Sequence, residues 1–250
     1  MEYSKMAPLY DRLMIDAPYD DWVAVIQEVI ASYSDRNVNS IVDFGCGTGV
    51  ITRKLAVQGY QLTGIDISED MLELAKKEAD PSLSIKWLKQ DITKLNNVPD
   101  MDMAISCCDV VNYIVNPTHI AEFFNSIYRS LNNNGLFLFD VHSLPHIEEI
   151  YINNTFADVT EAAAYIWFCQ PGDQEGEMYH ELTFFESDQS GKYDRYTETH
   201  HQRTFSVEFY KKLLFDTGFN NIQVFADFSI KTKNNIQEGE RIFFLAKKNE

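Results

Sequence analysis

The chain lacks the features that mark membrane and secreted proteins. None of its apolar runs approaches the roughly 18 residues that a membrane-spanning helix needs. Its first residues form no apolar signal segment. The four cysteines, two of them adjacent at Cys107 and Cys108, do not make a disulfide framework. We therefore expect a cytoplasmic protein in a reducing compartment, with no membrane partner.

Basic residues are also scarce. The 21 lysines and arginines face 38 aspartates and glutamates, which gives a formal net charge of −17. Such a charge repels the phosphate backbone of nucleic acid unless a local basic patch overcomes it, and the sequence shows no such patch. The lysine pairs at 76–77 and 211–212 lie on amphipathic helices and are interpreted as solvated faces. Nucleic acid is disfavoured as a partner, so small molecules or acid-tolerant protein targets remain.

Apolar residues are plentiful. They make up 45% of the 250 residues, which is enough for one large core. Charged residues make up a further 24% and keep the surface hydrated. We expect one domain that carries an insertion.

The most informative segment begins at Ile41. A short β-rich run ends in an acid and three alternate glycines, and residues 50–58 then have helical spacing up to Gly59. This order predicts a strand, a tight turn and a helix. Glycines in the turn allow positive φ and let a ligand approach the backbone beside a helix N-terminus. A second strand over 61–65 places Asp66 at its C-terminal tip, where an acid can accept hydrogen bonds from both ribose hydroxyls.

The glycine spacing distinguishes two classes of cofactor. A dinucleotide fingerprint requires G-x-G-x-x-G/A. Counted from Gly45, its second glycine falls on Gly47, but its last small position falls on Val50 and an extra glycine stands at Gly49. This spacing disfavours a dinucleotide-dependent oxidoreductase. The run Asp43-Phe44-Gly45-Cys46-Gly47-Thr48-Gly49 instead resembles the signature of class I S-adenosylmethionine-dependent methyltransferases.

The resemblance implies an α/β fold with a doubly wound, mostly parallel seven-stranded sheet and an antiparallel last strand. Further strands are expected over 84–89, 101–107, 136–141, 221–225 and 241–247, with helices over 117–131 and 205–219, the latter capped by Ser206 and closed by Gly218. The implied division is an N-terminal lid over 1–36, a cofactor-binding core over 37–143 and 205–250, and an inserted antiparallel β subdomain over 144–204.

The resemblance also implies how the cofactor S-adenosylmethionine is held. The glycine loop, with Asp43, Gly45, Cys46 and Gly47, passes its methionine end. Asp66 holds the ribose, Ile67 and Met71 border the adenine, Asp91 receives the adenine amino group, and Ile92 covers the ring. Cys108 contacts the cofactor through its backbone. Tyr10, in a segment similar to the family's lid, touches the methionine end, although aromatic packing of the helix over 19–32 is an equal alternative.

The segment Cys108-Asp109-Val110-Val111-Asn112-Tyr113 corresponds to the part of the family that faces the transferred methyl group. Asp109, Asn112 and Tyr113 are candidates for orienting the acceptor. Enzymes that methylate cytosine carbon place a cysteine nucleophile here, but no proline precedes this cysteine, and a cysteine within an apolar strand is more often inert packing. The Asn-Pro-Pro-Tyr turn of nucleic-acid and glutamine amino methyltransferases is absent as well.

The insertion reads as a β meander, with strands over 164–168, 178–186 and 193–205 and a turn over 187–191. It should lie over the C-terminal strand ends, and its hairpin should bring His180 close to Thr199 and His200. Three interpretations of these polar groups stay open. They are a metal site, cross-strand pairs such as Glu181 or Glu198 with Arg195 or Arg203, and a substrate contact or proton acceptor at His200 or His201. No established ligand spacing is present, so we expect no metal.

Together these features predict an enzyme that moves a methyl group to a nitrogen or oxygen of a small molecule by in-line displacement, in which positioning supplies most of the rate. The candidate bases are His142, His200 and His201. His142 follows the strand over 136–141, where Asp140 and His142 could instead only order the next loop. Arg241 or Arg203 could hold a substrate carboxylate. The alternative is a non-catalytic module that binds S-adenosylmethionine or a partner. The sequence leaves the acceptor and the oligomeric state open.

Overall fold

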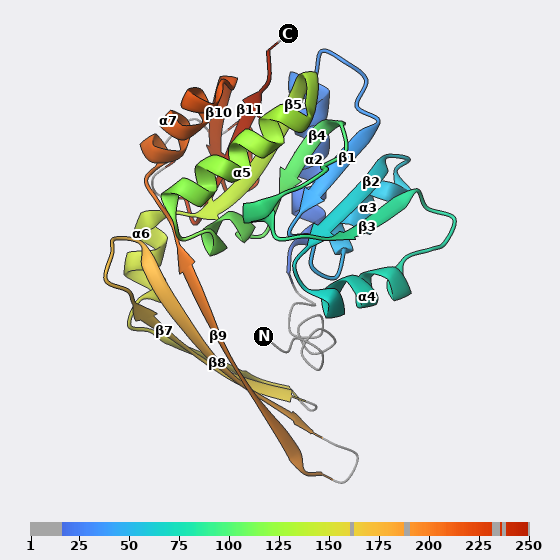
Figure 1. Ribbon diagram of the computed structural model, residues 1–250. Helices are drawn as coiled ribbons and strands as arrows, with labels where there is room; N and C mark the ends of the chain where they lie inside the picture. The colour runs from blue at the N-terminus through green and yellow to red at the C-terminus, as the bar shows by residue number, and fades with distance from the viewer. Residues whose placement is uncertain (1–16, 161–162, 188–190, 232–235, 237–238, 250) are drawn as a thin grey trace.

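The computed structural model describes residues 17–160, 163–187, 191–231, 236 and 239–249. Its main sheet has seven strands in the order β10-β11-β5-β4-β1-β2-β3, and only β11 runs against its neighbours (Figure 1). These strands are β1 (Ser40–Phe44), β2 (Gln61–Asp66), β3 (Ile85–Lys89), β4 (Met101–Ser106), β5 (Leu131–His142), β10 (Asn220–Ala226) and β11 (Arg241–Lys247). This is the mostly parallel, doubly wound sheet that the sequence predicts.

Helices cover both faces of the sheet. They are α2 (Tyr19–Tyr33), α3 (Val50–Val57), α4 (Glu69–Glu78), α5 (Pro117–Ser130) and α7 (Val207–Thr217), with short turns η1 (Ile92–Lys94) and η2 (Val110–Tyr113). Side chains alternate along β5: Phe137 and Phe139 join the cluster that packs against α5 and α7, whereas Leu136 and Leu138 join the cluster that packs against α2 and α3. A strand buried on both faces therefore reads as an unbroken apolar run.

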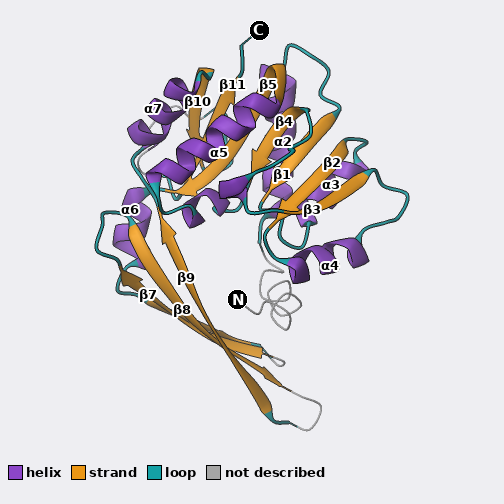
Figure 2. Cartoon of the chain, viewed as in Figure 1, coloured by secondary structure: helices purple, strands orange, loops and turns teal. Residues whose placement is uncertain are grey.

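A second sheet is inserted between β5 and α7, and it extends away from the main sheet below the ends of its parallel strands (Figures 1 and 2). It is antiparallel, in the order β6 (Thr155–Val159), β7 (Ala163–Pro171), β8 (Glu177–Ser187) and β9 (Tyr193–Arg203). His180 of β8 pairs with His200 of β9, and Glu181 pairs with Thr199. The predicted hairpin register is confirmed.

Most differences from the predicted elements lie at boundaries. Strand β5 begins at Leu131 rather than 136, because a register irregularity in its pairing with β4 lets it extend. The insertion contains elements that alternation does not reveal: the edge strand β6 and the helical segments α6 (Leu144–His146) and η3 (Ile147–Tyr151). Helix α7 has the predicted caps, since Ser206 Oγ accepts from the Phe209 amide at 3.2 Å and Gly218 has φ 110°.

No helix in the described part of the chain is both long and apolar enough to cross a membrane.

Candidate active site

The glycine loop between β1 and α3 forms one wall of a cavity. Gly45 has φ +76°, and a Cβ placed there would lie 2.4 Å from Val110 Cγ1, so a side chain would collide with η2. Gly47 also has positive φ, +54°, but a Cβ there would meet nothing within 4 Å. The first glycine therefore permits close packing, and the second leaves the loop open to a ligand.

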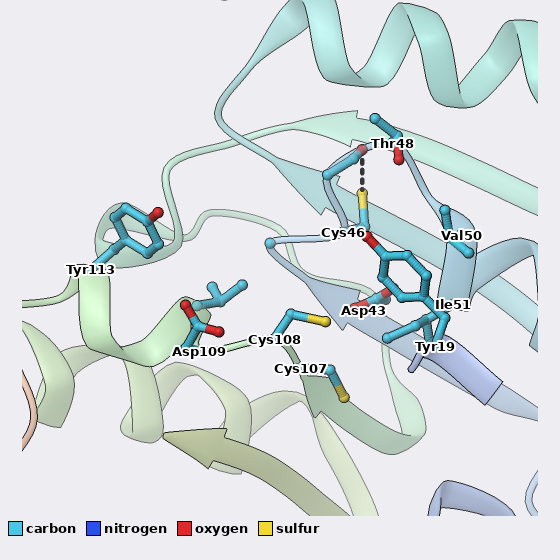
Figure 3. Close-up of a pocket in the computed structure, with 13 residues that line it drawn as sticks. Tyr19, Asp43, Cys46, Thr48, Val50, Ile51, Cys107, Cys108, Asp109 and Tyr113 are labelled. Atoms are coloured by element: carbon cyan, nitrogen blue, oxygen red, sulfur yellow. Dashed lines mark hydrogen bonds between the residues drawn. The ribbon is translucent and has the colours of Figure 1, made fainter. Parts of the chain in front are cut away.

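The cavity lies between this loop and the segment that follows β4 (Figure 3). Tyr113 and Asp109 stand on one side, and Cys46 and Tyr19 stand on the other. The lining residues are Tyr19, Asp43, Gly45, Cys46, Gly47, Thr48, Val50, Ile51, Cys107, Cys108, Asp109, Val110 and Tyr113. Predicted cofactor residues among them are Asp43, Gly45, Cys46, Gly47 and Cys108. Tyr19, Thr48, Val50, Ile51 and Val110 were missed, because apolar and helix-start residues carry no signal that separates a lining role from packing.

Asp66 fastens the glycine loop to the tip of β2. Its carboxylate accepts hydrogen bonds from the amides of Gly47 and Ser68, each at 2.8 Å. Burial raises the pKa of Asp66, and these amide bonds oppose that rise. The carboxylate therefore lies beside the loop at the C-terminal edge of the sheet, where a ribose would meet it.

The predicted adenine-binding residues follow the same edge but do not line the cavity. Ile67 is 62% exposed, and Met71 is buried in α4. Asp91 follows β3, next to β2, and its carboxylate accepts from the Thr93 amide at 2.9 Å and hydroxyl at 2.6 Å. Ile92 packs at the margin of the core. Tyr10 lies outside the described residues.

Asp140 of β5 organises the opposite wall. Its buried carboxylate accepts from the Trp22 indole at 3.0 Å, the Cys108 amide at 2.9 Å, the Asp109 amide at 3.0 Å and the Arg241 guanidinium. A carboxylate has about four lone-pair sites, so four donors satisfy it. Cys108 and Asp109 have positive φ, 61° and 54°, and this strained turn is held in place by the two amide bonds to Asp140.

Arg241 pairs with two acids. Its guanidinium donates to Asp140 and, at 3.2 Å, to Asp109, and it lies 4.9 Å from the centre of the Trp22 ring. Burial alone would raise the pKa of Asp109, but His142, Arg241 and Gln202 outweigh it and lower that pKa. The arginine suggested for a substrate carboxylate is thus committed within the protein. The sequence does contain a sign of this ion pair: Asp140 stands inside the apolar run 139–141, and Arg241 begins the apolar strand β11.

A row of hydrogen bonds links Asp109 to the inserted sheet. Gln202 donates to Asp109 at 3.2 Å, its amide oxygen lies 3.0 Å from His180 Nε2, and the Trp167 indole donates to His180 Nδ1 at 2.8 Å. Because an indole can only donate, Nδ1 accepts and Nε2 carries the proton. Burial lowers the pKa of His180 to about 4. Both ring nitrogens of this histidine are occupied, and no group of three or more metal-ligating side chains occurs among the described residues.

The other candidate side chains separate into different surroundings. Tyr113 lines the cavity, and its hydroxyl lies 3.2 Å from His200 Nδ1. The Asn112 amide bonds the His142 amide and the Arg203 carbonyl, each at 3.0 Å, so it ties η2 to β5 and β9. His142 lines a second cavity, between β5, β11 and the start of α7. His201 bonds Glu177 at 2.7 Å on the other face of the inserted sheet.

The cysteines near the cavity are poor nucleophiles. Burial raises the pKa of the Cys107 and Cys108 thiols, and nearby carboxylates raise it further. The thiolate is the nucleophilic form, so the structure gives no support to a covalent mechanism at either residue.

The residues present fit S-adenosylmethionine. A loop glycine faces open space, a carboxylate stands at the tip of the second strand, and the buried Asp43 lines the cavity. Carboxylates favour the positive charge that a sulfonium group carries.

Comparisons with known proteins agree with this site. Residues 41–135 match the family model of the methyltransferase domain. A protein of Geobacillus sp. (strain WCH70) with a provisional methyltransferase name is 36% identical over 99% of this chain and 100% of its own length. Bacillus subtilis (strain 168) YqeM, also provisionally named a methyltransferase, is 40% identical over 99% and 98%. A crystal structure of an S-adenosylmethionine-dependent methyltransferase from Clostridium acetobutylicum ATCC 824 superposes with a TM-score of 0.86 at 27% identity, covering 99% of both chains.

The fold and the cavity are those of a methyl-transferring enzyme that uses S-adenosylmethionine. The chain belongs to the class I S-adenosylmethionine-dependent methyltransferase family. The predicted family, enzyme class and cofactor are confirmed, and the alternatives of a non-catalytic module and a dinucleotide oxidoreductase fall away.

Replacing Asp66 with alanine tests the ribose contact. Loss of two charge-assisted hydrogen bonds should weaken S-adenosylmethionine binding roughly 10-fold to 100-fold in isothermal calorimetry. Glu73→Ala is the matched control, because Glu73 is an exposed acid on the adjoining helix α4. Equal affinities of the two variants would contradict the assigned role, and thermal unfolding checks that the loop is intact.

Asp43 should make cofactor binding depend on pH. Burial raises its pKa to about 7, opposed by the Thr52 hydroxyl bond and reinforced by Asp66. The sulfonium charge favours ionised Asp43, so binding should release protons, and affinity should rise as pH increases from about 6 to about 7.5. Calorimetry in two buffers of different ionisation enthalpy measures the protons released. The dependence should shrink with S-adenosylhomocysteine, which has no sulfonium charge. Persistence of the full dependence in Asp43→Asn would assign it elsewhere.

Arg241→Met should be strongly destabilising. It leaves the buried carboxylate of Asp140 and the partly buried carboxylate of Asp109 without their cation, which should lower the free energy of unfolding by about 3–5 kcal/mol in urea titrations. Lys212→Met breaks an exposed pair with Asp216 on α7 and should cost less than about 0.5 kcal/mol. Similar losses in the two variants would show that the ion pairs of Arg241 with Asp109 and Asp140 do not stabilise the fold.

Proposed function

We propose that the enzyme transfers the methyl group of S-adenosylmethionine to a nitrogen or oxygen of a small-molecule acceptor. The observation that carries this proposal is the position of the inserted sheet. Its strand β9 contacts η2 through Asn112 and Tyr113, beside the cofactor cavity. An acceptor bound between the sheet and the cavity would lie where the methyl group is presented.

The charge of the chain supports a small acceptor. With a formal net charge of −17, the protein repels polyanions such as nucleic acid and attracts a cationic cofactor. The walls next to the cavity are formed by single aromatic and polar side chains, Tyr19 and Tyr113 among them, rather than by a row of basic residues. This surface suits a compact organic molecule.

Relatives with stated acceptors support both kinds of target atom. A Rickettsia prowazekii (strain Madrid E) ubiquinone biosynthesis O-methyltransferase is 31% identical over 45% of this chain and 43% of its own length. The sugar N-methyltransferase KedS8 of Streptoalloteichus sp ATCC 53650 shares the fold, with a TM-score of 0.79 at 16% identity over 97% of this chain and 92% of its own.

S-adenosylmethionine supplies an electrophilic methyl group on a sulfonium sulfur. The protein's part is to hold the cofactor through the glycine loop and Asp66 and to hold the acceptor in line with the methyl group. Fixing both partners replaces a bimolecular encounter with a positioned one, which lowers the barrier without a universal catalytic residue. The hydrogen bonds from the Cys108 and Asp109 amides to Asp140 hold the turn that faces the acceptor in place.

The test begins with calorimetric titration of the protein with S-adenosylmethionine, S-adenosylhomocysteine and NAD. Binding of the two adenosyl ligands but not NAD is expected. A panel of small hydroxyl and amine compounds is then incubated with methyl-labelled S-adenosylmethionine, and products are separated by mass spectrometry. Labelled product with a small molecule, formed in smaller amount by Asp66→Ala at the same low cofactor concentration, is the expected result. Labelling only of added protein or RNA would overturn the small-molecule assignment.

A further inference from the structure

Tyr113, His200 and Glu198 form a hydrogen-bonded row that runs from the cavity wall into the inserted sheet. The Tyr113 hydroxyl oxygen lies 3.2 Å from His200 Nδ1, and His200 Nε2 lies 3.0 Å from Glu198 Oε2. Tyr113 comes from η2 and lines the cofactor cavity, whereas His200 and Glu198 lie two residues apart on β9. Residues i and i+2 of a strand share a face, so one strand supplies both groups.

With Glu198 ionised and the His200 ring neutral, each hydrogen bond of the row has one direction. An ionised carboxylate only accepts, so His200 Nε2 carries a proton and donates it to Glu198. Nδ1 of the neutral ring then presents a lone pair, and the Tyr113 hydroxyl donates to it. A phenol oxygen that donates its own proton can still accept one from another molecule. The row is therefore arranged to receive a proton at the cavity wall and pass it to the imidazole.

Partial burial makes the carboxylate effective. The side chains of His200 and Glu198 are only 17% and 16% exposed. A charge pair shielded to this extent from water is stabilised more than one at the surface. Glu198 thus accepts the hydrogen bond of Nε2 and holds the ring with Nδ1 toward Tyr113, as a buried carboxylate orients a catalytic histidine in other enzymes.

The neighbouring residue provides a natural control. His201 Nε2 bonds Glu177 Oε1 at 2.7 Å, and its ring stacks on Tyr179 with centroids 4.3 Å apart. Adjacent residues of a strand point to opposite faces, so this second histidine–glutamate pair faces away from the cavity. It has the same chemistry as His200 and Glu198 without the tyrosine that reaches the cavity.

We propose that Tyr113, supported by His200 and Glu198, accepts the proton of a hydroxyl acceptor. The proposal rests on the proposed function and names its substrate class. As the acceptor oxygen attacks, the bond from the methyl carbon to sulfur breaks and a carbon–oxygen bond forms. The hydroxyl proton passes to the Tyr113 oxygen while the Tyr113 proton passes to His200 Nδ1. The products are S-adenosylhomocysteine, the methyl ether and an imidazolium that returns its proton to water.

The chemistry of the acceptor explains why a hydroxyl is proposed rather than an amine. A neutral amine attacks with its lone pair and can keep its proton until after methyl transfer, so it needs no base during the step. A hydroxyl is a weak nucleophile until its proton is withdrawn. A fixed proton acceptor on the cavity wall is therefore useful chiefly to a hydroxyl substrate.

The first test reads the row without turnover. Nitrogen-15 NMR of the S-adenosylhomocysteine complex, with His200→Asn to assign the ring, should show a neutral His200 protonated on Nε2. Tyr113→Phe removes only the hydroxyl, so it should shift the Nδ1 resonance of His200 and leave that of His201 unchanged. A ring protonated on Nδ1, or one that does not respond to Tyr113→Phe, would overturn the proposal.

The second test uses catechol as the hydroxyl probe and benzylamine as the amine probe. Tyr113→Phe and His200→Asn should each lower kcat for catechol by roughly 100-fold or more. The KM for catechol and the rate with benzylamine should stay unchanged. His201→Asn should leave both rates unchanged. Equal losses with both probes would indicate a purely structural role and sink the proposal.

These outcomes separate the two proposals. If calorimetry shows no binding of S-adenosylmethionine, the proposed function fails. If the cofactor binds and either probe is methylated, but the variants show no selective loss with catechol, only the proton acceptor fails. If the wild-type enzyme methylates neither probe, the NMR test decides: a shift of the His200 Nδ1 resonance in Tyr113→Phe supports the proposal, and its absence overturns it.

Discussion

Four donors from separate parts of the chain converge on the buried carboxylate of Asp140. They come from Trp22 of α2, from the amides of Cys108 and Asp109 in the segment after β4, and from Arg241, the first residue of β11. A buried carboxylate is tolerated only when it is paired and hydrogen-bonded, so this arrangement constrains all of these elements together. The positive-φ turn at Cys108 and Asp109 depends on it. So does the direction in which the chain continues toward Tyr113.

The segment held by Asp140 also fixes the position of the inserted sheet relative to the cofactor cavity. Asp109 receives a bond from Gln202 on β9, and Asn112 bonds the Arg203 carbonyl on the same strand. These contacts join the core to the insertion at two successive residues of one strand. Because adjacent residues of a strand alternate between faces, fixing this register also decides which side chains of the strand meet the cavity. His200 is placed toward Tyr113, and His201 is placed away from it.

A continuous row of hydrogen bonds runs from the inserted sheet to the segment after β4. The row passes from Trp167 through His180 and Gln202 to Asp109, and each member has a defined donor or acceptor role. Fully satisfied networks of this kind specify one arrangement, whereas a partly satisfied one costs free energy. These hydrogen bonds thereby hold the inserted sheet against the cofactor cavity, in addition to the two chain connections from β5 and to α7.

The sequence by itself determined the sheet, the glycine loop and the class of cofactor, because hydrophobic periodicity and glycine spacing are local properties of a chain. It placed Asp66 at the tip of its strand and the hairpin register of His180 and His200 correctly. Only the tertiary structure decided which of two adjacent histidines faces the cavity, and that Arg241 is bound by Asp109 and Asp140 rather than held for a ligand. Both outcomes depend on contacts between residues about 90 to 130 positions apart, which no local pattern encodes.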